Sequence, residues 1–179
     1  MNLTAKRIPD EFIRAIPRGF RLVKKQDHDF LLVESLFCPK GHNLIVDSVR
    51  IHGEASIKLK VVISREPGLL FVDAFWGSHT KLFSFVPKIS GHEPIFAEAY
   101  CPYCDTDMIE SHTCGQKGCD SNKCVLLMLP GGNNKFHVCA KLGCPGHMLE
   151  IIDMPQALVR SVSVINYFGA GSEDLFGHM

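Results

Sequence analysis

Residues 101–147, CPYCDTDMIESHTCGQKGCDSNKCVLLMLPGGNNKFHVCAKLGCPGH, decide how this chain folds. They contain seven of its eight cysteines and few long apolar runs. A segment of this composition cannot fold on apolar burial alone, and metal binding is the usual source of the missing free energy. Thiols at such short spacings in a reducing compartment are typical of metal ligands rather than of disulfides. The segment therefore predicts a fold held together by bound metal ions.

The whole chain has the composition of a folded globular protein. It has 179 residues, 46% hydrophobic and 21% charged, which indicates one domain or a domain with a small appended module. The 19 basic residues balance the 19 acidic ones, so the electrostatic signature of a dedicated nucleic-acid-binding protein is missing. The sequence shows neither a signal peptide nor a membrane-spanning run. We therefore expect a soluble, cytoplasmic protein with no membrane partner.

Three short segments share one pattern, in which Cys-Pro is followed by a second soft ligand. The Cys-Pro step opens a tight turn that aims backbone N–H groups at the first sulfur and brings the second ligand round to the same ion. Gly41 and Gly146 would allow a positive φ just before each histidine. The segments are Cys38-Pro39-Lys40-Gly41-His42, Cys101-Pro102-Tyr103-Cys104 and Cys144-Pro145-Gly146-His147.

An ungapped repeat of 17 residues overlaps the last of these turns, and it aligns residues 114–130 with residues 139–155. Each copy has the pattern Cys-x4-Cys with glycine before the second cysteine, followed by an apolar strand that ends in proline. Between the two copies, an apolar run at 125–129, a Gly-rich turn and a run at 135–138 indicate a β-hairpin.

Two ligand pairs on either side of a β-hairpin resemble a zinc ribbon, and Cys101-Pro102-Tyr103-Cys104 is similar to the knuckles of zinc ribbons and rubredoxins. The resemblance covers residues 101–147, about a quarter of the chain. The Cys-x4-Cys spacings of Cys119 to Cys124 and of Cys139 to Cys144 are wider than the common Cys-x2-Cys knuckle. The resemblance implies a structural metal and an interaction surface, and it implies no reaction.

Eight cysteines together with His42 and His147 are enough for two tetrahedral zinc sites. We expect the first site to close residues 43–100 as an insertion, and its ligands to be Cys38, His42, Cys101 and Cys104. We expect the second site to flank the hairpin with Cys119, Cys124, Cys139 and Cys144, with Cys114 and His147 as substitutes. An alternative is a self-contained ribbon of Cys101, Cys104, Cys114 and Cys119. Mixed S and N ligands favour zinc over iron or an iron–sulfur cluster.

The remaining segments predict a mainly β fold, an antiparallel meander with one short N-terminal helix. Short apolar runs separated by Gly and Pro mark strands at 20–23, 30–37, 44–46, 56–63, 69–72, 81–86 and 95–97. The helix is expected to begin at Pro9. We divide the chain into a basic N-terminal segment (1–37), a meander domain with the first zinc site (38–113), a zinc-ribbon-like module (114–155), and a C-terminal strand at 157–165 within a last segment (156–179) that ends in a loose tail.

These features favour a binding protein over an enzyme. The chain has no Gly-rich phosphate loop, no G-x-S-x-G elbow and no H-E-x-x-H motif, so no catalytic residue and no small-molecule substrate can be named. We expect an accessory subunit, adaptor or regulator that recognises a protein partner. One alternative is a zinc enzyme with an open coordination position, built from leftover groups such as Cys114, His147 or His112, with Glu110 or Asp107 as base. The other is an RNA- or DNA-binding protein, which zero net charge disfavours.

Overall fold

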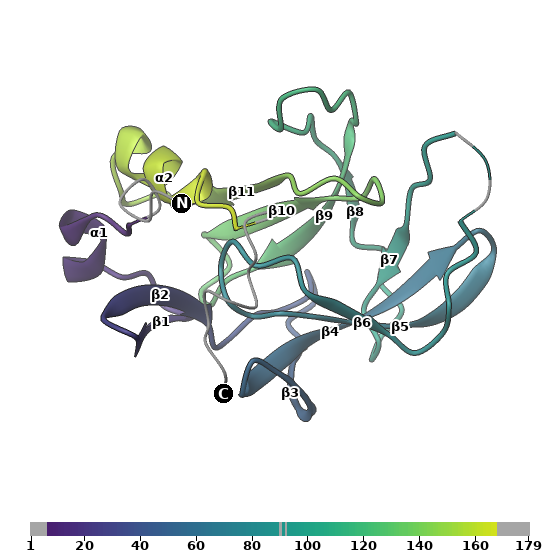
Figure 1. The fold of residues 1–179 in the computed structure, drawn as a ribbon, viewed down its shortest axis with the longest axis horizontal. Coiled ribbons are helices and arrows are strands. Elements are labelled where there is room, and N and C mark those ends of the chain that lie inside the picture. Colours follow the sequence, from purple (N-terminus) through teal and green to yellow (C-terminus); the bar gives the residue numbers. More distant parts are fainter. Residues whose placement is uncertain (1–6, 90, 92, 168–179) are drawn as a thin grey trace.

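The structure is a computed structural model that describes residues 7–89, 91 and 93–167. Its strands form a five-stranded sheet, a four-stranded sheet and a two-stranded hairpin, and the strand pairs are antiparallel (Figure 1). The predicted fold class, mainly antiparallel β with a short N-terminal helix, is confirmed. Within the described ranges, no helix is long and apolar enough to cross a membrane.

The N-terminal part follows its sequence pattern closely. Helix α1 (Asp10–Arg14) begins directly after Pro9 and buries Phe12. The strands β1 (Phe20–Lys25) and β2 (His28–Val33) pair as a hairpin. The short helix and the two strands are therefore confirmed near the predicted places.

The five-stranded sheet is built around β4 (Glu54–Ile63). The strand β5 (Glu66–Val72) runs along one side of β4, and β3 (Ile45–Ile51) and β7 (Glu98–Tyr100) pair with successive parts of its other side. The strand β6 (Lys81–Phe83) extends the sheet beyond β5. Every second residue of β4 from Ile57 to Ile63 is buried, as expected for a strand with one face toward a core.

The four-stranded sheet has the order β11-β10-β9-β8. It consists of β8 (Ile109–Ser111), β9 (Lys123–Met128), β10 (Lys135–Cys139) and β11 (His147–Glu150). The strands β9 and β10 form the predicted hairpin. One hydrophobic cluster includes residues of both sheets, among them Leu59 of β4 and Leu127 of β9. The two sheets therefore share one core.

The predicted C-terminal strand at 157–165 is wrong, because the chain forms helix α2 (Gln156–Ser163) there. Its β-branched residues favour a strand by propensity, but Val159 and Val162 lie one helical turn apart and both are buried. The Trp76 indole N–H donates to the Val162 carbonyl at 2.9 Å. Tertiary packing thus overrides the local strand propensity and favours a helix. The predicted loose tail lies outside the described residues.

Two further differences concern very short elements. The predicted strand at 95–97 contributes only a single bridge, from Phe96 to Lys141. The strands β7 and β8, with three residues each, were not predicted. Elements of this length hold too few residues to show a period of two.

Candidate metal centres

Site 1, as we name the group of Cys38, His42, Cys101 and Cys104, joins the two ends of the meander. The first two residues lie between β2 and β3, and the last two follow β7. The ligand atoms of all four lie within 4.8 Å of one another. The structure thus brings together the four residues that the sequence predicts for the first site.

The distances in site 1 fit a tetrahedral ion. Cys38 Sγ lies 3.5 Å from His42 Nδ1 and 4.0 Å from Cys104 Sγ. Two sulfurs bound tetrahedrally to zinc at about 2.3 Å lie about 3.8 Å apart, whereas a disulfide requires about 2.05 Å. All eight cysteines of the chain are free thiols. The spacing is therefore that of ligands around an ion.

Hydrogen bonds to Cys38 and Cys104 in site 1 favour the thiolate form that binds metal. The His42 N–H donates to Cys38 Sγ at 3.4 Å. Burial, the largest single influence, raises the pKa of Cys38, but hydrogen bonds from the backbone and ring of His42 and from the backbone of Lys40 together lower it. The Thr106 hydroxyl, 3.0 Å from Cys104 Sγ, lowers the pKa of Cys104 to about 6. The hydrogen bond with Cys38 raises the pKa of His42.

Site 2 is the group of Cys114, Cys119, Cys139 and Cys144, and it lies where the two repeat copies meet. The first two residues come from the segment between β8 and β9, Cys139 ends β10, and Cys144 precedes β11. The ligand atoms again lie within 4.8 Å of one another. Cys114 Sγ lies 3.7 Å from Cys144 Sγ, and Cys119 Sγ lies 3.9 Å from Cys139 Sγ. Each copy therefore contributes its own Cys-x4-Cys pair.

Cys124, which the sequence predicts for the second site, lies outside this group, and Cys114 takes its place. The buried Cys124 thiol lies on β9 and donates to the His112 carbonyl at 3.4 Å. The repeat explains the difference, because Cys124 aligns with Leu149, a buried apolar position, whereas Cys114 aligns with Cys139. Equivalence within the repeat, rather than nearness to the hairpin, selects the ligands.

His147, the other predicted substitute, is also outside site 2. Its Nε2 donates to the Ile165 carbonyl at 2.8 Å. Its ring packs edge-on against Trp76 at 4.7 Å and stacks on His79 at 5.3 Å. The alternative ribbon is wrong as well, because Cys101 and Cys104 lie in site 1 while Cys114 and Cys119 lie in site 2.

Glycines shape the turns of both sites. Gly118 and Gly143 each precede the second cysteine of a repeat copy, and both have a φ of 84°, which side chains with a Cβ rarely adopt. Gly41 has the predicted positive φ, at 92°. Gly146 does not, and its role is different, because a Cβ there would overlap Cys114 Sγ. Glycine at 146 lets the backbone approach that sulfur.

The electrostatics of site 2 require a cation if all four sulfurs are to be thiolates. Burial raises the pKa of Cys114 to about 11 and also raises the pKa of Cys144. The Ser121 N–H lowers the pKa of Cys119. Four sulfurs this close cannot all ionise without a positive charge between them, and a divalent metal supplies that charge. The group can therefore hold a metal ion and would release protons on binding it.

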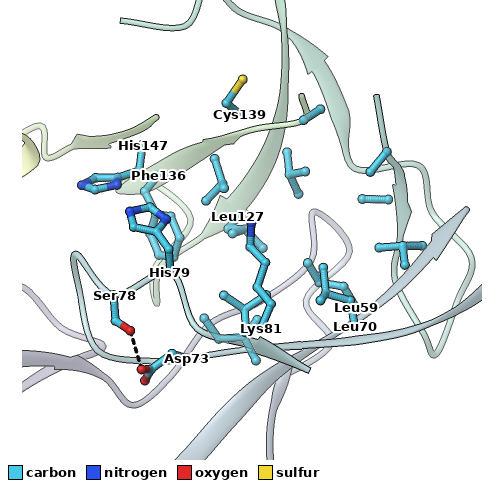
Figure 2. A pocket seen from close by; sticks show the side chains of 18 of the residues that line it. Leu59, Leu70, Asp73, Ser78, His79, Lys81, Leu127, Phe136, Cys139 and His147 are labelled. Carbon is cyan, nitrogen blue, oxygen red and sulfur yellow. Dashed lines mark hydrogen bonds between the residues drawn. The ribbon is translucent and has the colours of Figure 1, made fainter. Parts of the chain in front are cut away.

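A cavity of about 100 Å³ lies beside site 2, in the core between the two sheets. Its walls are mainly apolar and include Leu59, Leu70, Leu127 and Phe136. Figure 2 shows the Lys81 side chain reaching from β6 toward Leu127. Burial lowers the pKa of Lys81, and no carboxylate in the described part of the chain forms an ion pair with it.

A third group of possible ligands consists of His112, His137 and Glu150. Only His112 was singled out from the sequence. The available signal was again the repeat, since His112-x-Cys114 and His137-x-Cys139 occupy equivalent positions.

Comparisons of the chain with protein-family models, with curated proteins and with solved structures found no match. The chemistry of these Cys and His groups is therefore the basis for assigning a function.

Proposed function

We propose that this chain is a zinc protein whose sites 1 and 2 are structural, and that it recognises a protein partner as an accessory subunit, adaptor or regulator of a larger complex. One observation carries the structural role. Each site offers four side-chain ligands, in two pairs from separate parts of the chain. Structural zinc sites are closed in this way, whereas catalytic sites keep one position for water or substrate.

Ligand chemistry supports zinc as the metal. Site 1 combines three sulfurs with one imidazole nitrogen and site 2 has four sulfurs, and both sets are common in structural zinc sites. Iron could also bind four thiolates. Elemental analysis of the purified chain is expected to give at least two zinc ions per molecule. Two cobalt ions exchanged for them are expected to show sulfur-to-cobalt charge-transfer bands. Iron at site 2, or fewer than two ions, would contradict the assignment.

Exposed apolar side chains support protein recognition. The segment 82–89 begins in β6 and exposes Leu82 by 45%, Val86 by 86% and Ile89 by 67%. The segment is held in place on the sheet, since the Phe85 ring packs over Gly68 and the Lys88 carbonyl accepts a hydrogen bond from Ser64 at 2.9 Å. Apolar side chains that stay in water while their neighbours anchor the backbone are typical of a binding surface.

A pair of charge substitutions tests this surface. Val86→Glu with Ile89→Glu is expected to remove a partner that co-purifies in fixed ratio with the native chain, while both zinc ions and the melting temperature are retained. Ile152→Glu with Val164→Glu is the matched control, because these side chains are 67% and 70% exposed elsewhere on the molecule. If the control variant alone loses the partner, or if both variants keep it, segment 82–89 is not the recognition surface.

Charge pairing argues against the nucleic-acid alternative. Arg7 lies 3.8 Å from Asp10, and Arg21 lies 3.4 Å from Glu34 and 3.3 Å from Glu54. Carboxylates therefore accompany these basic side chains of the N-terminal segment, and the net charge of the chain is zero. Binding to single-stranded RNA or duplex DNA that weakens steeply with salt would support the alternative.

The cavity favours a second candidate function, the binding of a small apolar molecule with an acidic group. Its volume of about 100 Å³ is of the order of cavities that take one aromatic ring, and Lys81 places an amine beside apolar walls. Benzoate is the probe and toluene its neutral counterpart. Lys81→Met is expected to lose benzoate and keep toluene, as measured by calorimetry. Equal binding of benzoate by both chains, or no binding by either, would remove this candidate.

A further inference from the structure

Two histidines stack on one another beside β10, in a place that sites 1 and 2 do not use. His112 follows β8 and His137 lies in β10. Their ring centroids are 4.0 Å apart and their planes differ by 3°. Two glutamates flank the buried His137, Glu110 of β8 on one side and Glu150 of β11 on the other. Figure 1 shows the strands from which these side chains come.

The repeat places the two histidines together in the same way as it places the cysteines of site 2. His112 lies two residues before Cys114, and His137 lies two residues before Cys139. The repeated unit is therefore His-x-Cys-x4-Cys. Equivalent cysteines meet in one group and equivalent histidines meet in another, so the duplication builds two clusters of metal-binding side chains.

The hydrogen bonds of this cluster leave a place that a cation would fill. Glu110 Oε2 lies 2.7 Å from His137 Nε2. An ionised carboxylate only accepts, so His137 Nε2 is the donor. His137 Nδ1 then lies 3.6 Å from Glu150 Oε1. Without a second proton on Nδ1, a nitrogen lone pair and a carboxylate oxygen face each other.

In this cluster, two buried ring nitrogens find no hydrogen-bond partner among the described residues, namely His137 Nδ1 and His112 Nε2. His137 is only 2% exposed, so bulk water does not satisfy it. A metal ion would bind both nitrogen lone pairs. It would also replace the repulsion between the His137 Nδ1 lone pair and the Glu150 carboxylate by attraction of both to the ion.

We propose that His112, His137 and Glu150 form a third cation site, which takes a divalent transition metal such as zinc and leaves one coordination position open to water. Their ligand atoms lie within 4.8 Å of one another. Imidazole nitrogens select transition metals over magnesium or calcium, and two histidines with one glutamate are a donor set of catalytic zinc sites. Glu110 is a positioning residue, because its bond to Nε2 turns the Nδ1 lone pair of His137 toward the ion.

The stacked rings must tilt when the ion binds. Ligation requires the metal to lie near the plane of each ring, and two planes 3° from parallel do not converge on one point. Rotation about χ2 of His112, which is less buried than His137, opens the stack. Metal binding is therefore expected to change the environment of both rings.

The test uses the full chain with sites 1 and 2 already filled by zinc. Titration with cobalt is expected to add one equivalent, with visible d–d bands and no new sulfur-to-cobalt charge transfer. The absence of sulfur bands separates this site from sites 1 and 2, so its failure would leave the proposed structural zinc sites intact. New sulfur bands, or no binding of the third equivalent at millimolar cobalt, would overturn the third site.

Half-exposed carboxylates provide variants that should still fold. Glu150→Gln is expected to abolish the third equivalent, while Lys135→Met, which removes only the ion pair with Glu150 at 3.8 Å, keeps it. Glu110→Gln is expected to weaken cobalt binding by about tenfold to a hundredfold and to change the tautomer of His137 in ¹⁵N spectra. Unchanged ring ¹⁵N shifts on adding zinc, with both nitrogens of His137 protonated, would show a histidinium between two carboxylates and overturn the metal site.

Discussion

Site 1 joins parts of the chain that are far apart in sequence, whereas site 2 joins two copies of one short repeat. Cys38 and Cys104 are separated by 66 positions, and Cys119 and Cys139 by 20. Cys38 and Cys101 belong to the hydrophobic core, with exposures of 1% and 0%. All four residues of the site 2 turn at 115–118 are exposed. Site 1 therefore sits within a structure that apolar burial also supports, and site 2 shapes a turn that little else supports.

This difference separates two consequences of metal binding. Closing a long loop reduces the entropy of the unfolded chain, and the reduction grows slowly with loop length. Ordering an exposed turn without buried side chains depends on the metal itself. Loss of the ion from site 1 is expected to lower the stability of the whole fold, and loss from site 2 to unfold its turns locally.

The largest effect is expected at Cys101. Cys101→Ser removes a site 1 ligand and leaves a hydroxyl in the core. Loss of a cross-link that spans 66 positions is worth about 4 kcal/mol in the loop-entropy model. Urea unfolding should show one transition at a lower midpoint, together with one zinc ion fewer. Tyr103→Ala, in the same turn but 52% exposed, should keep both ions. A second, separate transition in the Cys101 variant would contradict a global role for site 1.

Site 2 is tested by substituting Cys114, which the structure places among the ligands, and Cys124, which the sequence predicts as a ligand. Cys114→Ser is expected to lose one zinc ion and about 3 kcal/mol, with faster amide exchange confined to the turns of site 2. Cys124→Ser should keep both ions, because its side chain bonds to the His112 carbonyl instead. Metal analysis and hydrogen exchange measure both outcomes. Zinc loss from the Cys124 variant alone would restore the ligand set that the sequence favours.

The sequence predicted the local geometry of the ligands better than their partners. A Cys-Pro turn sets the bite of Cys38 with His42 and of Cys101 with Cys104 within a few residues, and these four residues come together as predicted. The choice between Cys114 and Cys124 depends on how the two repeat copies meet in space. Nearness to the hairpin along the chain predicted Cys124, whereas the structure places Cys114 in the group. The contact of His79 with His147 joins separate regions, so no local pattern could indicate it.

Secondary structure shows the same division. The β9–β10 hairpin follows from an apolar run, a Gly-rich turn and a second run, all of which are local. Helix α2 was missed because valine propensity outweighed a helical spacing of only two buried valines. Its buried face is fixed by two hydrogen bonds to the rest of the fold. The Trp76 indole N–H donates to the Val162 carbonyl, and the Leu149 N–H donates to the Ser163 hydroxyl. Such contacts exist only in the folded chain.

A smaller effect is expected from one methyl group at the contact between the repeat copies. A Cβ at Gly146 would overlap Cys114 Sγ, so Gly146→Ala should cost about 2 kcal/mol by overpacking and weaken zinc at site 2 only. Gly115→Ala is the matched control, because its Cβ meets no atom within 4 Å and the equivalent position of the second copy is Ala140. Zinc affinity and thermal melting measure both. Equal losses in the two variants would show that the contact with Cys114 does not matter.

The smallest effect concerns the junction of the two regions, where His79 of the meander stacks on His147 of β11. Burial lowers the pKa of His79 from 6.5 to about 4 and lowers the pKa of His147 as well. Because the unfolded chain takes up the proton first, the stability that neutral His79 provides is present above pH 6.5 and is lost as the pH falls toward about 4. With allowance for partial exposure, the loss is about 1 to 2 kcal/mol.

Comparison of His79→Asn with the native chain isolates this contribution from acid release of the metals, which both chains share. Unfolding free energies measured at intervals between pH 7 and pH 4 should fall less steeply in the variant. Above pH 7, His79 is neutral in both the folded and the unfolded chain. There the unfolding free energies of the two chains should differ by a constant amount that does not depend on pH. A parallel fall in both chains down to pH 4 would mean that acid acts on the two metal sites alone and that the junction between the regions does not titrate.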